Sequence, residues 1–560
     1  MRIKVGWALL VAAGFSAVTL LARQPVHARH AMVVVEEPLA ADIGLRVLQS
    51  GGNAIDAAVA IGFALAVTYP YAGNLGGGGF LLAHFADGRS TFIDFRETAP
   101  MAATRNMYLD SSGNVTQDSV VGWRAAGVPG TVRGLELAHQ KYGHKPWAEL
   151  LDPAIRLASQ GYPVSYSMDA SLHSEGETAL LSQFPDSKRI FLSAHYGDKF
   201  VQPELAATLK RIRDRGASDF YDGETARKLA AAMAANGGLI TLEDLKQYQA
   251  KEREPLHGHY HGDEIITSPP PSAGGVGLLQ MLGMLEGSGY EKGGAGSAAS
   301  IHYVAEVMRR FYADRSQYFG DPDFYKVPIS KMLDPKYIAS RRSTIDPLHA
   351  TPSSEIRPGN LSVHEGSETT HFNVVDSEGN AVAVTYTLNN GFGSGVTVPG
   401  LGFLLNDEMD DFAAKPGTEN LFHLIQGESN AIQPGKRPVS SMTPTIVLRD
   451  GKLFLMLGAP GGSRIINGVL EVLLNVEDFH MNVQDAVDWP RFHHQWMPDV
   501  LYLERGISPD TVRILQGMGH NVSPLEGTTP VVARVEAILN QGGWLQGAAD
   551  PRANGKAKGY

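Results

Sequence analysis

Cysteine is absent from this chain of 560 residues. Its absence excludes a disulfide, a zinc site with thiolate ligands and a cysteine nucleophile. Basic residues are in the minority, with 48 Lys and Arg against 59 Asp and Glu and a net charge of -11. Proteins that bind nucleic acid usually have an excess of basic residues, so this balance argues against nucleic acid as a partner. The length suits one large layered unit or two domains.

Long uncharged runs are rare, and the clearest one lies at the N-terminus. Met1 to Lys4 is basic, and Val5 to Ala22 carries no charge. Val26 and Ala28 are small residues at the two positions that a signal peptidase reads. Residues 1–28 are therefore predicted to be a secretory signal, cleaved after Ala28, that directs the protein to the periplasm or out of the cell. The alternative is an uncleaved membrane anchor, because about 18 uncharged residues can just span a bilayer.

Apolar residues recur with helical spacing in many segments of the first 320 residues. Asn53 can cap one of these helices, with Asp56 three residues further on. The helix that follows consists almost entirely of small and apolar residues, so we expect it to be buried. The predicted helices are Pro38–Leu48, Ala54–Val67, Thr131–Tyr142, Trp147–Gln160, Gly223–Asn236, Val276–Leu285 and Ser297–Ser316.

A glycine run, Gly76 to Gly79, precedes two predicted strands, Phe80–Phe85 and Ser90–Phe95. The run lacks the Lys-Ser/Thr of a nucleotide phosphate loop and the spacing of a dinucleotide fingerprint. We interpret the glycines as positions where the backbone must approach its neighbours closely. Arg96 directly follows the second strand, where an arginine is usually a solvated or paired surface charge.

Phe372–Asp376 and Ala381–Thr387 are predicted to form a hairpin around a Gly-Asn turn. Thr369 and Thr370 precede the first strand, and threonines that merely enter a strand are common. A second interpretation is a cut before Thr369, which would make its hydroxyl a nucleophile and its new α-amine the adjacent base. The preceding polar segment, Pro352–Glu368, is expected to be mobile, as a cleavage point requires.

Six motifs, in order and spacing, resemble the γ-glutamyltransferase (γ-glutamyltranspeptidase) family of N-terminal-nucleophile hydrolases. The resemblance extends from about Arg29 to Tyr560. The motifs are Gly73–Phe80, Asp94–Glu97, Ser367–Phe372, Leu404–Phe412, Lys436–Pro444 and Gly458–Arg464.

The resemblance implies an α/β fold, a four-layer αββα sandwich built from two chains. Self-cleavage between Glu368 and Thr369 would give a large subunit, 29–368, and a small subunit, 369–560, that associate as a heterodimer. The implied reaction moves γ-glutamyl groups from glutathione and related amides to amino acids, dipeptides or water through an ester on Thr369. Neither a cofactor nor a metal is implied.

Family roles also fall on particular residues. By resemblance, Thr387 hydrogen-bonds the nucleophile, and the backbone N–H groups of Gly461 and Gly462 bind the oxyanion. Arg96, with Ser440 and Ser441, would hold the donor's α-carboxylate, because a guanidinium fork suits that group. Asn389, Glu408 and Asp411 would hold its α-ammonium. Phe422 takes the place of a gating aromatic in a lid, usually tyrosine in bacterial members. The site residues implied by the resemblance are therefore Thr369, Thr387, Gly461, Gly462, Arg96, Asn389, Glu408, Asp411, Ser440, Ser441 and Phe422.

Ordinary structural readings exist for several of these positions. Without the resemblance, Asp407–Asp411 would be a solvated acidic turn, and Gly461-Gly462 a turn after the strand Leu453–Leu457. His493-His494 has no partner motif for a metal, and His371 is interpreted as a packing or hydrogen-bonding residue rather than the base.

The sequence is also compatible with two other functions. One is a related acylase on the same scaffold, cleaving a cephalosporin or glutaryl side chain or poly-γ-glutamate. It is disfavoured by the joint presence of Arg96, Glu408, Asp411, Ser440 and Ser441. The other is a non-catalytic periplasmic binding protein, which predicts an uncut chain.

Overall fold

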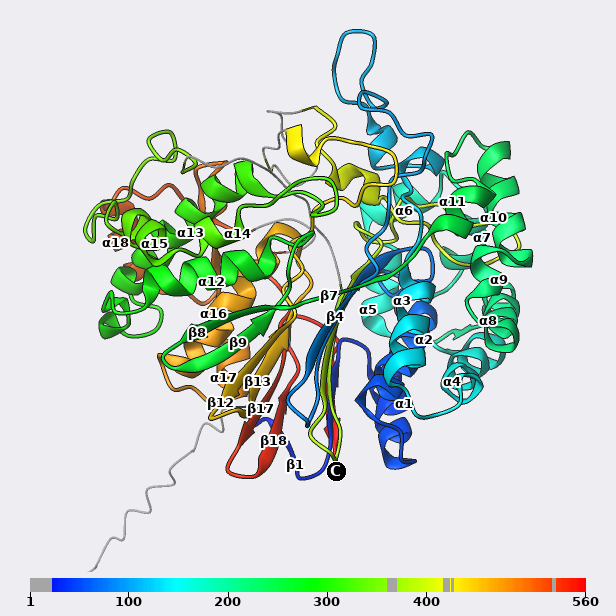
Figure 1. The fold of residues 1–560 in the computed structure, drawn as a ribbon, viewed down its shortest axis with the longest axis horizontal. Coiled ribbons are helices and arrows are strands. Elements are labelled where there is room, and N and C mark those ends of the chain that lie inside the picture. Colours follow the sequence, from blue (N-terminus) through cyan, green and yellow to red (C-terminus); the bar gives the residue numbers. More distant parts are fainter. Residues whose placement is uncertain (1–22, 360–369, 416–423, 425–427, 526–529) are drawn as a thin grey trace, which may run out of the picture.

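The computed structural model describes residues 23–359, 370–415, 424, 428–525 and 530–560. Two seven-stranded sheets pack face to face, and helices cover the outer face of each sheet. Figure 1 shows the sheets edge-on in the middle, with α1 to α4 on one side and α12, α13 and α16 on the other. The four-layer αββα sandwich implied by the family resemblance is confirmed.

The first sheet has the strand order β19-β2-β10-β11-β3-β4-β7, and its neighbouring strands are antiparallel. Strands from the beginning, middle and end of the chain therefore alternate within one sheet. The strands are β2 (Met32–Val35), β3 (Gly78–His84), β4 (Ser90–Asp94), β7 (Lys251–Arg253), β10 (Thr370–Val375), β11 (Ala381–Thr387) and β19 (Lys556–Gly559).

The second sheet has the order β1-β18-β17-β13-β12-β9-β8, again with antiparallel neighbours. Its edge strand β1 consists of the last three residues of the predicted signal. The strands are β1 (Val26–Ala28), β8 (Leu256–Tyr260), β9 (Asp263–Thr267), β12 (Thr445–Arg449), β13 (Lys452–Gly458), β17 (Glu536–Gln541) and β18 (Trp544–Ala548).

The central strands are buried on both faces. On β3, Phe80 and Leu82 face the second sheet, whereas Leu81 and Ala83 face the helices. This division follows from the period of two along a strand. Gly79 pairs with Tyr386, and a Cβ on Gly79 would lie 2.3 Å from the carbonyl oxygen of Thr385. Glycine thus lets β3 begin at Gly78, two residues earlier than the sequence predicted.

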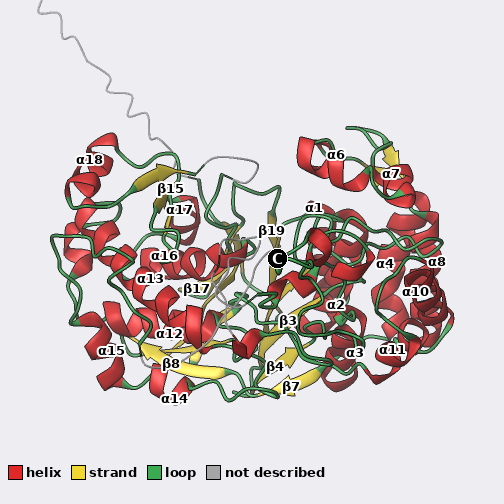
Figure 2. Ribbon diagram, turned by 90° about the horizontal axis from the view of Figure 1, so that it is seen from above, coloured by secondary structure: helices red, strands yellow, loops and turns green. Residues whose placement is uncertain are grey.

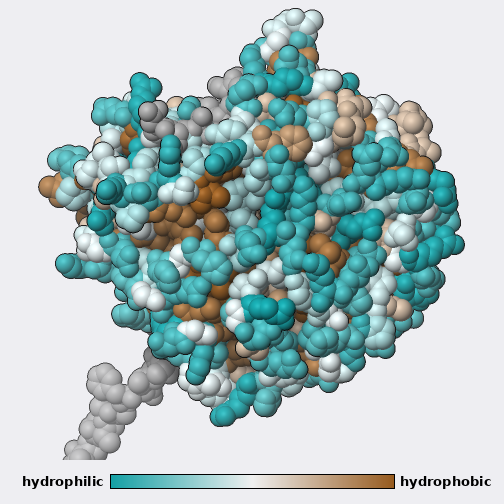
Figure 3. All heavy atoms as spheres, viewed as in Figure 1, coloured by the Kyte–Doolittle hydropathy of each residue, from teal (hydrophilic) through white to brown (hydrophobic). Residues whose placement is uncertain are grey.

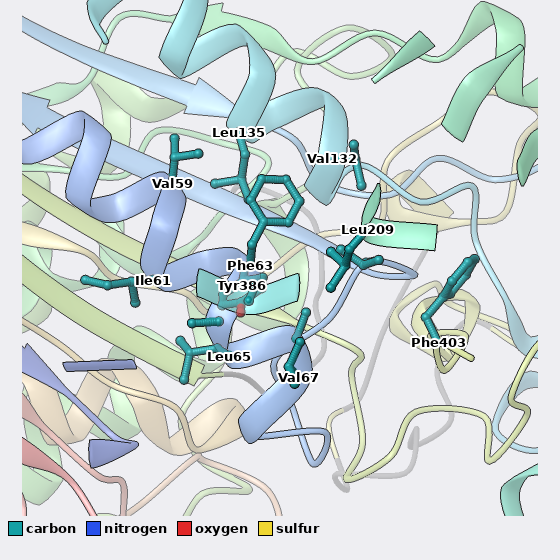
Figure 4. Close-up of a cluster of buried hydrophobic side chains, with 14 of the residues drawn as sticks. Val59, Ile61, Phe63, Leu65, Val67, Val132, Leu135, Leu209, Tyr386 and Phe403 are labelled. Carbon is teal, nitrogen blue, oxygen red and sulfur yellow. The ribbon is translucent and has the colours of Figure 1, made fainter. Parts of the chain in front are cut away.

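Helices α1 (Pro38–Gln49), α2 (Ala54–Thr68), α3 (Thr131–Tyr142), α4 (Trp147–Gln160) and α8 (Pro203–Arg215) belong to the layer outside the first sheet. Figure 4 shows part of this layer, where Phe63, Leu65 and Leu135 meet Tyr386 of β11. Every residue of α2 is buried, and Asn53 and Asp56 form a capping box at its start, as the sequence predicted.

Helices α12 (Gly274–Leu285), α13 (Ala298–Tyr318), α16 (Ile465–Glu477) and α17 (Val483–Asp488) cover the second sheet. Figure 2 shows the helices of both outer layers from above. The remaining elements are peripheral. They are α5 (Tyr166–Leu172), α6 (Glu175–Leu181), α7 (Pro185–Phe191), α9 (Ser218–Tyr221), α10 (Glu224–Ala235), α11 (Leu242–Gln247), α14 (Ile329–Met332), α15 (Pro335–Arg342), α18 (Pro509–Gly517), β5 (Tyr162–Pro163), β6 (Lys199–Phe200), β14 (Phe492–His493), β15 (Leu501–Leu503) and β16 (Val522–Pro524).

The predicted hairpin is confirmed as β10 and β11, and all seven predicted helices are present with ends shifted by at most two residues. The face seen in Figure 3 is mostly hydrophilic, with hydrophobic residues gathered on the side of the second sheet. Among the described residues, no helix has both the length and the hydrophobicity to cross a bilayer.

Candidate active site

The described part of the site begins at Thr370, the first residue of β10. Its hydroxyl donates a hydrogen bond to Oε2 of Glu36, 2.9 Å away, and both side chains are buried. Burial raises the pKa of the Glu36 carboxyl to about 7, although the nearby Arg534 and this hydrogen bond lower it. The start of β10 is therefore fixed to the end of β2. Glu368, Thr369 and Phe422 lie outside the described residues.

Thr387 and Asn389 lie where β11 ends, beside the start of β10. The backbone N–H of Asn389 donates to the Thr387 hydroxyl over 2.8 Å, and Asn74 Nδ2 donates to the Thr387 carbonyl over 2.7 Å. Asn389 has a φ of 79°, a left-handed conformation that asparagine tolerates better than most residues. Its Nδ2 donates to the carbonyl of Asp407, which leads into the acidic segment.

Arg96 follows β4, and its side chain is only 1% exposed. Its guanidinium forms hydrogen-bonded ion pairs with Glu408 and Asp411. Nε also donates to the carbonyl of Pro438 over 3.2 Å, and Nη2 donates to that of Val439 over 3.0 Å. The N–H donors of Arg96 therefore join the segment of Glu408 and Asp411 to that of Pro438 and Val439, and both segments lie more than 300 residues after Arg96 in sequence.

The acidic segment is not a solvated turn. Glu408–Asp411 forms a buried 3-10 helix against Arg96, so the structural alternative weighed for Asp407–Asp411 is wrong. The predicted ligands of the donor's carboxylate and ammonium thus lie in one cluster, with Arg96 paired directly to Glu408 and Asp411. Carboxylates this deeply buried require such a partner, because burial without one is costly.

Carboxylates outnumber the guanidinium in this cluster, which also contains Glu97, 3.8 Å from Arg96 Nη1. Burial raises the pKa of Glu97 to about 7 and that of Glu408 well above its usual range, although Arg96 lowers both. One guanidinium faces three carboxyl groups, so the cluster favours an additional positive charge or protons. Glu97 belonged to a sequence motif, but sequence reasoning gave it no role; its adjacency to Arg96 was the available signal.

Ser440 and Ser441 immediately follow the two carbonyl groups that bind Arg96. The Ser440 hydroxyl accepts from the backbone N–H of Met442 over 3.1 Å. The Ser441 hydroxyl accepts from Arg315 of α13 over 2.8 Å. Both serines are buried at the same cluster, but neither is hydrogen-bonded to Arg96 among the described contacts.

Gly461 and Gly462 form the turn between β13 and α16. Their φ angles are 140° and 63°, values that favour glycine over residues with a Cβ. Gly458, at the end of β13, packs on the ring of His371, the second residue of β10. The Tyr312 hydroxyl on α13 donates to the carbonyl of Ser463. The glycine turn therefore lies near the start of β10, and α13 contacts both this turn and Ser441.

The histidines singled out in the sequence are buried and hydrogen-bonded. The ring nitrogens of His371 lie 2.9 Å from Thr385 Oγ1 and 3.1 Å from Asn373 Oδ1, and burial lowers its pKa to about 3. A neutral imidazole with a hydrogen-bond partner at each ring nitrogen is a poor general base at neutral pH. Burial likewise lowers the pKa of His493 to about 3 and that of His494 to about 4.

Known proteins resemble this chain both in sequence and in fold. The sequence model of the gamma-glutamyltranspeptidase family matches residues 40–560. Over 549 residues the chain is 48% identical to a glutathione hydrolase proenzyme of Pseudomonas sp. (strain A14), covering 96% of this chain and 95% of the relative. It is 47% identical over 536 residues to the glutathione hydrolase proenzyme of Escherichia coli (strain K12), with 94% and 91% covered.

A solved structure extends the similarity in three dimensions. The crystal structure of cephalosporin acylase from Bacillus halodurans superposes with a TM-score of 0.85. The match covers 98% of this chain and 99% of the acylase at 26% sequence identity. The whole layered architecture is therefore shared, and the site residues must carry the distinction between the two activities.

Proposed function

The chain belongs to the gamma-glutamyltranspeptidase family, and we propose that Thr369 is the nucleophile with which this enzyme transfers γ-glutamyl groups and hydrolyses glutathione. In the precursor, the Thr369 hydroxyl attacks the carbonyl carbon of Glu368, and the peptide nitrogen leaves. That departure frees the α-amine of Thr369, and water then hydrolyses the resulting ester to give the Thr369 hydroxyl and the carboxylate of Glu368. In the mature enzyme that amine takes the hydroxyl proton during attack on the donor amide.

The order of the strands supports two subunits that remain associated after the cut. Strands β10, β11 and β19 follow Thr369 in sequence, and they lie among β2, β3, β4 and β7, which precede it. Separating the products would break the ladders between β2 and β10 and between β11 and β3. We therefore propose that residues 29–368 and 369–560 form one heterodimer, in line with the proenzyme names of the relatives.

The register of the hairpin supports Thr387 as a partner of the nucleophile. Thr370 pairs with Tyr386, and Thr387 is the next residue along β11. Thr387 therefore lies one residue beyond the first pair of this ladder, at the end of β10 where the chain enters from Thr369. The hydroxyl of Thr387 accepts from the backbone N–H of Asn389, and a threonine hydroxyl has one proton to donate as well as lone pairs that accept.

The cluster around Arg96 is the observation that carries the proposed substrate specificity. A γ-glutamyl head is zwitterionic, and the cluster offers a buried guanidinium beside Glu97, Glu408 and Asp411. A donor's α-carboxylate can replace one carboxylate partner of Arg96, while its α-ammonium pairs with the carboxylate that is released. Ser440 and Ser441 can add hydroxyl donors at the carboxylate, and Asn389 an amide oxygen at the ammonium.

The Gly461-Gly462 turn supports a proposed oxyanion site. It precedes α16, a helix of 13 residues. Backbone N–H groups at a helix start favour negative charge, and glycine lets the chain approach the reacting carbonyl closely. Donors aimed at the developing oxyanion are often the largest single contribution to such catalysis.

The proposal has three further parts. The acceptors are amino acids or dipeptides, Phe422 belongs to a lid over the site, and residues 1–28 direct export. Export rests on the basic start and the apolar run of the N-terminus. The structure adds one consequence, because a cut after Ala28 removes edge strand β1 from the second sheet.

A gel and N-terminal sequencing test the nucleophile. Purified wild-type protein is expected as two chains, the smaller beginning Thr-Thr-His-Phe, and with γ-glutamyl-anilide activity. Thr369→Ala should remain a single inactive chain. The matched control, Thr370→Ser, keeps the hydroxyl that binds Glu36 and should still be cleaved. A smaller chain that begins at another residue refutes the assignment of Thr369, and an uncut wild-type chain favours a binding protein.

A further inference from the structure

Three potential metal ligands meet at the edge of the helical layer, away from the cluster around Arg96. Asp169 lies on α5, His173 caps the end of this helix, and His195 lies in the turn after α7. One potential ligand atom from each residue lies within 4.8 Å of the other two. Figure 2 places α6 and α7 at the periphery of the molecule.

The spacing of these atoms fits one small tetrahedral ion. Oδ1 of Asp169 lies 3.0 Å from Nδ1 of His173 and 3.7 Å from Nδ1 of His195. Ligands at 2.0–2.1 Å around a tetrahedral Zn²⁺ are separated from one another by about 3.3–3.4 Å. The two observed distances bracket this value. The imidazole rings are stacked, with centroids 4.5 Å apart and an angle of 13° between their planes, so both edges face the same carboxylate.

The carboxylate oxygen that faces both imidazole rings has lone pairs that are not used in hydrogen bonds with described residues. Asp169 Oδ1 is buried and accepts no hydrogen bond from any residue that the structure describes, despite the nearby imidazoles. His173 Nδ1 instead lies 3.1 Å from the backbone carbonyl of Asp169. His173 Nε2 lies 3.5 Å from the carbonyl of Leu192, and a carbonyl in that position stabilises the tautomer whose Nδ1 is free to bind a metal.

Among the described residues, the other histidine–carboxylate ion pairs each involve a single imidazole. His257 pairs with Glu264, and His349 pairs with Asp346, each as a single contact at the surface. In the described ranges, no second group of three such side chains could share one ion. Two imidazoles and a carboxylate form a donor set typical of zinc and neighbouring divalent transition metals.

We propose that Asp169, His173 and His195 bind a divalent transition-metal ion of the zinc class, with water completing the coordination. The side chains of Asp169 and His173 are 27% and 28% exposed and that of His195 is 64% exposed, so an ion can enter from solvent. Each imidazole binds the ion in its neutral form through the lone pair of Nδ1 and keeps its proton on Nε2, and any proton of an imidazolium form is released to solvent. No change of oxidation state is involved.

Metal binding would join α5 to the turn after α7 and so stiffen a segment that packs beside the catalytic hairpin. The ring of Phe191 on α7 lies 6.1 Å from that of Phe392, in the loop after β11. Ser187 on α7 donates a hydrogen bond of 2.6 Å to the carbonyl of Gly395 in the same loop. The proposed role of the ion is to stabilise this helical segment.

Zinc titration of untagged, processed enzyme tests the site after treatment with a chelator. Wild type should bind one Zn²⁺ per heterodimer by calorimetry, and its thermal midpoint should rise with Zn²⁺. His195→Ala and Asp169→Asn should each weaken binding at least about tenfold, because each removes a ligand. Co²⁺ should give the intense visible bands of a four-coordinate site in wild type but not in His195→Ala or Asp169→Asn.

His349→Ala is the matched control, since it removes an exposed histidine that also faces one carboxylate. This variant should bind Zn²⁺ like wild type. The proposal is overturned if wild type binds no stoichiometric Zn²⁺, or if His195→Ala and His349→Ala bind it equally. Turnover of γ-glutamyl-anilide at a permissive temperature should be the same in all of these variants, which separates this site from the catalytic assignment.

Discussion

Replacing Arg96 with lysine keeps a positive charge but removes the planar fork. In the structure, the guanidinium contacts Glu408, Asp411 and the carbonyl groups of Pro438 and Val439 at the same time. A lysine ammonium has three donors at one point and cannot span these four groups. Arg96→Lys should therefore raise the KM for γ-glutamyl donors, because the carboxylate of the donor loses its bidentate partner.

The expected size of this effect follows from the contacts that are lost. A hydrogen bond to a charged group contributes about 1.5–3 kcal/mol, which corresponds to roughly ten- to a hundred-fold in affinity. We expect a rise in KM within that range for the loss of one such contact to the donor. Self-cleavage should survive, because Arg96 contacts the acidic cluster and the segment before Ser440.

Steady-state kinetics with γ-glutamyl-anilide on fully processed protein measure this effect. The matched control is Arg213→Lys, because Arg213 also contacts two carboxylates, Asp152 and Asp214, but at the surface. Surface ion pairs of this kind contribute about 0–1 kcal/mol, so Arg213→Lys should leave the KM and kcat for the donor nearly unchanged. Unchanged donor kinetics in Arg96→Lys would remove Arg96 from the donor site and refute the reasoning.

Three further predictions concern the same site. Asp411→Asn should lose γ-glutamyl-anilide turnover by orders of magnitude while glutaryl-anilide, which has no ammonium, is little affected; equal losses would make Asp411 purely structural. Gly461→Ala should lower kcat by about a hundred-fold with little change in KM, whereas Gly451→Ala, with a φ of 71° in an open turn, should leave kcat unchanged. Burial raises the pKa of Glu97 to about 7, so its contribution to stability is present below about pH 4.5 and is lost as pH rises through 7. Chemical denaturation should therefore show that the free energy of unfolding of Glu97→Gln rises relative to that of wild type between pH 5 and 8, by at most about 3 kcal/mol. A difference between the two proteins that does not change with pH would contradict the raised pKa of Glu97.

Local sequence patterns determined several of the longest helices and the central hairpin. The hairpin of β10 and β11, the capping box of Asn53 and Asp56, and the ends of α3 and α4 were all predictable, because each depends on residues within a few positions of one another. The family motifs also located the candidate site residues along the chain. Periodicity cannot, however, specify which distant segments pair, so the alternation of β10 and β11 with β2 and β3 required the structure.

Tertiary structure alone decided the electrostatics of the site. The run Asp407–Asp411 reads as solvated in isolation, but it is buried against Arg96. Desolvation depends on everything that packs around a group, and so the raised pKa of Glu97 cannot be read from its neighbours in sequence. The same holds for the stacked rings of His173 and His195, which are 22 positions apart in a sequence that carries no metal motif there. The residue types and their order are local information, whereas burial and the distances between charged groups depend on packing between segments far apart in the chain.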